Sequence, residues 1–164
     1  MELDSATGER IRVLKAIDFD FAFLALLTHR GLKPMSRWGK PLAGAGLEAL
    51  RQLGLQTRKI RRTVRMDKSF NETVFACAPG YLDIYAAHFD HRPVDSSAET
   101  VRIEGFLFGY PPCCVAQYVK HHYAPDEFPI HKEQPLFHWV CQGCQITSLL
   151  VPAYKEIYRL VDRC

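Results

Sequence analysis

The stretch 106–115, with the sequence FLFGYPPCCV, constrains this chain most, because it joins two prolines to two adjacent cysteines. Pro112 has a backbone φ close to the helical value and lacks an N–H group, so it suits the first turn of a helix. We therefore predict a helix over about 112–123, with Cys113 and Cys114 in its first turn. Free N–H groups and the helix dipole favour anions there, which lowers the pKa of a thiol. Such thiolates can bind a metal ion or attack an electrophile.

A second cysteine pair, Cys141 and Cys144, lies downstream with Cys-x-x-Cys spacing. The two pairs together offer four soft ligands, a set that selects zinc, copper(I) or an iron–sulfur cluster. His138 precedes Cys141 by three residues and is either a further ligand or a hydrogen-bond partner of one. We therefore predict a metal site formed by Cys113, Cys114, Cys141 and Cys144, with an iron–sulfur cluster as the cofactor and zinc as the alternative.

Length and composition indicate one globular domain. The 164 residues are 48% hydrophobic and 24% charged, which is ordinary for a folded protein with an adequate core. We expect a flexible terminus over 1–9 and a single domain over 10–164. Within it, about 10–95 should hold helices and a small sheet, and about 96–164 a helical, cysteine-bearing part. The predicted class is α+β, mostly helical, with a small antiparallel β-sheet and the metal site between two C-terminal helices.

Periodicity and stop signals place the remaining elements. Apolar residues at helical spacing, glycine stops and a Ser96–Glu99 capping box predict helices over 17–30, 42–53, 97–108 and, from 142 or 144, to 161. Short apolar runs on either side of Pro79 and Gly80 predict a β-hairpin over 73–78 and 81–87. Proline and glycine content predicts loops over 33–46 and 124–135.

A basic stretch over 58–65 has β-branched residues interleaved with the charges and predicts a strand. Alternation would place Lys59, Arg61 and Arg65 on one face, and Ile60 and Val64 on the other. The three cations are candidate ligands for a phosphate, a carboxylated substrate or RNA. The alternative is a solvated edge strand whose charges discourage aggregation.

Charge and hydropathy also indicate the setting in which the chain works. A net charge of +3 is too small to imply a nucleic-acid partner. The apolar run 19–27 is too short to span a bilayer and lacks the flanks of a signal peptide, so we expect a cytoplasmic protein without a membrane partner. Cysteines in that compartment stay reduced. The sequence leaves open whether four histidines also bind metal: His88, His91, His121 and His122.

A resemblance covers about the C-terminal third. The motif GYPPCCV, followed by His138, Cys141, Cys144, Ser148 and a terminal amphipathic helix, resembles an uncharacterised prokaryotic family of small proteins with a Gly-Tyr-Pro-x-Cys-Cys motif. In ligand pattern only, the chain is similar to the iron–sulfur epoxyqueuosine reductases that use vicinal cysteines. That similarity implies the four cysteines as cluster ligands. It does not extend to substrate or reaction.

Three functions are compatible with these features. The first is an iron–sulfur, or zinc, enzyme that acts on a small molecule or modified nucleoside. His138 or Tyr110 would supply a proton there, the basic strand would hold an anionic group, and an electron-donor protein could be a partner. The second is a non-catalytic interaction module stabilised by zinc. The third is a metal-free thiol redox protein with a reversible Cys141–Cys144 disulfide.

Overall fold

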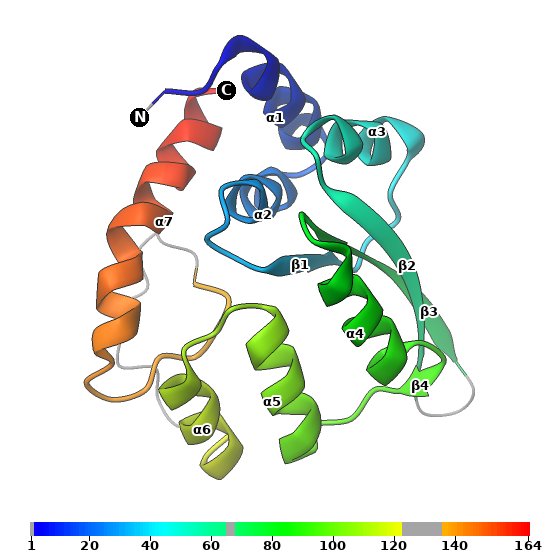
Figure 1. Cartoon of the computed structure of the whole chain (residues 1–164), viewed down its shortest axis with the longest axis vertical. Coiled ribbons are helices and arrows are strands. Elements are labelled where there is room, and N and C mark those ends of the chain that lie inside the picture. Colours follow the sequence, from blue (N-terminus) through cyan, green and yellow to red (C-terminus); the bar gives the residue numbers. More distant parts are fainter. Residues whose placement is uncertain (1, 65–67, 123–135) are drawn as a thin grey trace.

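A computed structural model describes residues 2–64, 68–122 and 136–164 of the chain. The described residues form seven helices and a four-stranded sheet (Figure 1), which confirms the predicted α+β class and its helical majority. The helices are α1 Ser5–Ile17, α2 Phe19–His29, α3 Gly44–Gln52, α4 Pro79–Phe89, α5 Ala98–Leu107, α6 Pro112–Lys120 and α7 Gln145–Arg163. The strands are β1 Met35–Trp38, β2 Gln56–Thr63, β3 Ser69–Ala76 and β4 Arg92–Pro93. No helix in these ranges is long and apolar enough to cross a bilayer.

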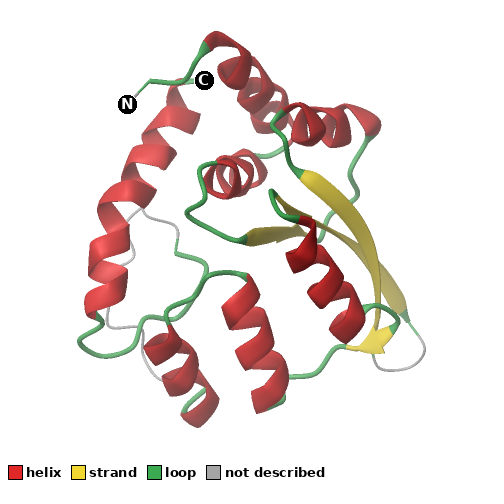
Figure 2. Cartoon of the chain, viewed as in Figure 1, coloured by secondary structure: helices red, strands yellow, loops and turns green. Residues whose placement is uncertain are grey.

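The sheet is mixed, whereas the sequence predicted a purely antiparallel one. Its strand order is β1-β3-β2-β4, and β3 pairs antiparallel with both β1 and β2. The short strand β4 pairs parallel with β2 through Arg62 and Arg92. The reason is the crossover through α4, which returns the chain to the sheet in the direction of β2 (Figure 2).

The predicted hairpin over 73–78 and 81–87 is wrong, because only its first half is a strand. Pro79 occupies the first turn of α4 instead of a β-turn, and its fixed φ suits that position. Leu82, Tyr85 and Phe89 recur at helical spacing and are buried against the sheet. The short aromatic run 81–87 is compatible with either a strand or a helix. It forms a helix here, because it covers one face of the sheet.

Other boundaries shift by local capping. Asp18 accepts the backbone N–H of Asp20 and begins α2, so the expected 17–30 helix starts two residues later. Asp4 does the same for α1, which therefore begins at Ser5, inside the stretch expected to be flexible. Strand β1 lies within the expected loop 33–46. The expected loop 124–135 falls entirely outside the described residues.

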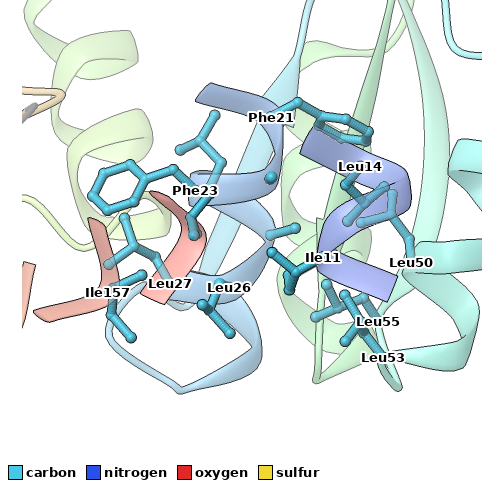
Figure 3. Packing of buried hydrophobic residues seen from close by; sticks show 14 of the residues in the cluster. Ile11, Leu14, Phe21, Phe23, Leu26, Leu27, Leu50, Leu53, Leu55 and Ile157 are labelled. Carbon is cyan, nitrogen blue, oxygen red and sulfur yellow. The ribbon is translucent and has the colours of Figure 1, made fainter. Parts of the chain in front are cut away.

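The main core surrounds α2. Every residue from Phe21 to Thr28 is buried, because α1, α7, β1 and β3 pack around this helix. Figure 3 shows Phe23 and Leu27 of α2 beside Ile157 of α7, while Ile11 and Leu14 approach from α1. The apolar run at 19–27 is therefore the central helix of the domain.

Two smaller clusters lie apart from this core. One fills the space between the sheet and helices α4 and α5. The other contains only Cys114, Val140, Cys141 and Cys144, with Leu136 packed against it. The segment 136–144 forms no helix or strand (Figure 2), but Leu136 and Phe137 within it pack against the main core.

Candidate metal centre

The turn between α5 and α6 positions the first cysteine pair. Gly109 has a φ of 70°, in the left-handed region, and ends α5. Pro111 is the N-cap of α6, and Pro112 occupies its first turn, as predicted. Cys113 and Cys114 therefore project from the first turn of α6.

The second pair is positioned by the start of α7. Cys144 is the N-cap of α7, and its Sγ accepts the backbone N–H of Thr147 at 3.3 Å. Gly143 has a φ of 66°, which lets the chain turn sharply between the two cysteines. The backbone N–H of Cys141 donates to Cys114 Sγ at 3.4 Å and joins this turn to α6.

These elements bring the four sulfur atoms together, and we name Cys113, Cys114, Cys141 and Cys144 the cysteine cluster. The Sγ atoms all lie within 4.8 Å of one another. Cys114 Sγ lies 3.4 Å from Cys144 Sγ and 3.7 Å from Cys141 Sγ, and Cys113 Sγ lies 3.6 Å from Cys144 Sγ. Three of the four side chains are buried, and Cys113 is exposed. The cysteine cluster could bind a metal ion between two C-terminal helices, where the sequence predicted a site.

The thiols differ in acidity. Burial opposes the Cys144 thiolate, but hydrogen bonds from Thr147 outweigh it and lower the pKa of Cys144 to about 7. Burial raises the pKa of Cys114 to about 11, against the expectation that the helix terminus would lower it, and it also raises the pKa of Cys141. Desolvation therefore exceeds the dipole effect for Cys114. A metal cation would displace these protons, because it binds the thiolate form.

Thr147 and His138 lie next to the sulfurs. Thr147 Oγ1 lies 3.2 Å from Cys144 Sγ and 3.8 Å from Cys114 Sγ. His138 Nε2 lies 3.0 Å from the same hydroxyl, and the His138 ring lies 5.3 Å from the Tyr110 ring between centroids. The two residues predicted to supply a proton, His138 and Tyr110, are thus neighbours beside the cysteine cluster. Burial raises the pKa of Tyr110 to about 12.

A pocket of about 300 Å³ adjoins the cysteine cluster. Its walls come from β1, α5 and the turn before it, α6 and the turn into it, and the segment before α7. Aromatic rings and a few polar groups dominate the lining: Arg37, Asp95, Ser96, Glu104, Tyr110, Tyr118, Phe137, His138 and Trp139, with Cys114 at the side of the metal site. This combination is typical of a small-molecule site.

An ion-pair network forms the polar wall of the pocket. Glu104 Oε1 accepts from Arg37 Nη1 at 2.8 Å and from Arg62 Nη1 at 2.9 Å. Arg37 also donates to Tyr85 Oη at 3.4 Å, and Tyr85 donates to Glu72 at 2.6 Å. The sequence predicted no site role for Arg37, Arg62, Tyr85 or Glu72, because their partners lie far away in the chain.

The predicted substrate-binding cations lie elsewhere. Lys59 and Arg61 are exposed on β2 and do not line the pocket beside the cysteine cluster. Arg61 instead donates to Ser69 and, through its backbone, to Asp90. Arg65 lies outside the described residues. The sequence left open whether four histidines bind metal. Within the described ranges, no histidine belongs to a group of three or more potential ligands, and the cysteine cluster is the one such group.

A buried lysine adjoins the same region and was also missed. Lys33 is 2% exposed, and its Nζ donates to the Phe108 carbonyl oxygen, the C-cap of α5, at 2.7 Å. The rings of Tyr110 and Phe137 lie 4.8 and 5.5 Å from Nζ. Burial, with a smaller effect of nearby Arg37, lowers the pKa of Lys33 from 10.5 to about 7. The Lys33 amino group thus caps a helix end and lies among aromatic rings.

Comparisons with known proteins provide no further assignment. The chain matches no protein-family model, no curated protein and no solved structure. The geometry of the cysteine cluster and of the adjoining pocket is therefore the basis for the function proposed below.

Proposed function

We propose that the cysteine cluster binds one metal ion, with zinc as the best fit, and that this ion holds one wall of a small-molecule pocket. The four thiolates would be the ligands, and Thr147 and His138 would orient them from outside. When bound, the ion supplies charge that stabilises four clustered thiolates and cross-links two parts of the chain.

The separation of the sulfur atoms supports a single ion. Four thiolates at about 2.3 Å from one ion stand about 3.8 Å apart at the corners of a tetrahedron. Three of the separations in the cysteine cluster are 3.4, 3.6 and 3.7 Å. Only small side-chain shifts would complete the tetrahedron.

An iron–sulfur enzyme is the alternative that the sequence favoured. A cluster places several iron atoms and their sulfides between the protein thiolates, so the thiolates stand farther apart than around one ion. All four sulfurs of this chain lie within 4.8 Å of one another. The compact arrangement therefore favours a mononuclear centre, which zinc or a single iron could occupy.

The packing around the site supports a local structural role for the ion. The apolar cluster at the site is small, whereas α7 is anchored independently in the main core through Tyr154 and Ile157. Four protein ligands leave no open coordination position on a tetrahedral ion. The ion would thus fix the segment 136–144, which contributes Phe137, His138 and Trp139 to the pocket.

Metal content and an absorption spectrum, measured on protein purified without oxygen, test this proposal. We expect one zinc per chain and no colour. Replacement by Co²⁺ should give the strong visible bands of a tetrahedral four-thiolate site, and Cys114→Ser should abolish them. Iron with acid-labile sulfide and a broad band near about 400 nm would instead establish a cluster and overturn the single-ion proposal. A metal-free protein with a reversible Cys141–Cys144 disulfide would leave the redox function.

A further inference from the structure

We propose that the pocket beside the cysteine cluster binds a flat heteroaromatic base of the guanine type, with Arg37 and Glu104 reading its polar edge. This inference rests on the proposed function, since the metal would hold the segment that supplies part of the aromatic wall. Three features of the pocket support this ligand: its charge balance, its available hydrogen-bonding groups and its aromatic rings.

Charge balance favours a neutral ligand. Arg37 is neutralised by Glu104, and Arg62 behind it adds a second positive charge to the same carboxylate. Asp95, a further acid, lies in the pocket wall. A simple anion would meet the two acids of the lining, and a simple cation would meet the Arg37 guanidinium group, with the charge of buried Arg62 behind it. A neutral molecule with both donors and acceptors avoids both penalties.

The polar wall keeps a donor and an acceptor available side by side. Within the described ranges, Glu104 Oε2 accepts no hydrogen bond, since both arginines bind Oε1. Arg37 has five N–H donors, and its bonds to Glu104 and Tyr85 both use Nη1. The side chain of Glu104 is 20% exposed and that of Arg37 is 43% exposed, so both are accessible from the pocket. Guanine presents an oxygen acceptor next to N–H donors on one edge, which matches this pair.

The remaining walls suit a flat ring. Tyr110, Tyr118, Phe137 and Trp139 line the pocket, and Trp139 is 50% exposed. Bases stack on such aromatic faces with little dependence on sequence. A volume of about 300 Å³ accommodates a base with its sugar and excludes a longer strand.

Tryptophan fluorescence provides the test on the intact, metal-loaded protein. The chain has two tryptophans: Trp139 lines the pocket, while Trp38 is buried against Phe21 in the main core. We expect guanosine to quench Trp139 saturably, with half-saturation below about 1 mM. Adenosine, which presents the opposite donor and acceptor pattern, should bind at least tenfold more weakly. Trp139→Phe should remove the quenching, and calorimetry should still detect binding.

One variant and its control test the recognition of the base edge. Glu104→Gln should weaken guanosine binding tenfold or more and reduce the preference over adenosine. Glu48→Gln is the matched control, because Glu48 pairs with Arg51 on α3 and lies outside the pocket. It should leave binding unchanged.

The outcomes distinguish this inference from the proposed function. Equal binding of guanosine and adenosine, or no binding by either at full zinc loading, would overturn the inference and leave the single-ion proposal standing. Selective guanosine binding to protein that contains no metal would support the pocket assignment and overturn its dependence on the ion. Because the nucleoside comparison uses the unmodified chain, it remains decisive even if Glu104→Gln fails to fold.

Discussion

Replacing Gly109 by alanine should destabilise the protein through two separable effects. Gly109 has a φ of 70°, and a Cβ atom there would lie 2.7 Å from Pro34 Cδ. The left-handed conformation costs a non-glycine residue about 1–2 kcal/mol. Overpacking against a rigid proline ring adds about 1–3 kcal/mol. We therefore expect Gly109→Ala to lower the free energy of unfolding by about 2–5 kcal/mol.

Gly54 provides a matched control for the backbone effect. It follows α3 as Gly109 follows α5, and its φ is 75°. Among the described residues, and apart from its chain neighbours, no atom lies within 4 Å of the Cβ position at Gly54. Gly54→Ala should therefore cost only the conformational part, about 1–2 kcal/mol. The difference between the two variants measures the contact with Pro34.

Urea unfolding followed by circular dichroism would measure both variants, with the slope m checked for constancy. Adding Pro34→Ala to Gly109→Ala should recover part of the loss, because it removes the ring that the new methyl group meets. Equal destabilisation by Gly109→Ala and Gly54→Ala would refute the claim that the α5–α6 turn packs closely on the residue before β1. So would a double variant that recovers nothing.

Three further predictions concern the site. Cys114→Ser should abolish stoichiometric metal binding but retain most helical circular dichroism, because the main core packs independently of the cysteine cluster; Cys77→Ser should bind metal normally. Thr147→Val should weaken metal affinity about 10–100-fold in a competitive chelator titration, because it removes the hydroxyl beside Cys144 Sγ. The unfolded chain keeps Lys33 protonated up to about pH 10, whereas burial lowers its folded-state pKa to about 7, so this residue should make stability rise with pH between 7 and 10. Urea unfolding at pH 7 and 9 measures this effect. The free energy of unfolding of Lys33→Met should rise less with pH than that of the unsubstituted chain, and an equal rise would contradict the lowered pKa of Lys33.

Sequence reasoning predicted the grouping of the four cysteines, because its signals are local. The proline at the start of α6 and the Cys-x-x-Cys spacing before α7 each determine where a cysteine points. It failed at 81–87, because this run is too short for its helical spacing to outweigh the turn signal of Pro79 and Gly80. It also overlooked β1, because four residues bounded by proline and glycine resemble a loop until β3 pairs with them.

The polar wall of the pocket follows from a long-range pairing that no local pattern specifies. Arg37 lies in β1 and Glu104 in α5, and these elements meet only after the sheet forms. Helix propensity and charge would place Glu104 on a solvated face. The contact therefore depends on the topology of the fold, and the pattern of charges along the chain does not predict it.

One local signal could still have identified Arg62. Alternation along β2 correctly placed Lys59 and Arg61 away from Ile60, and those two cations are exposed. Arg62 falls on the face of Ile60 and is 2% exposed. A charge at an apolar position of a strand must find a partner, because burying it alone costs several kcal/mol. Arg62, the cation at an apolar position of β2, therefore marks the link of this strand to Glu104 and the pocket. The exposed cations Lys59 and Arg61 do not.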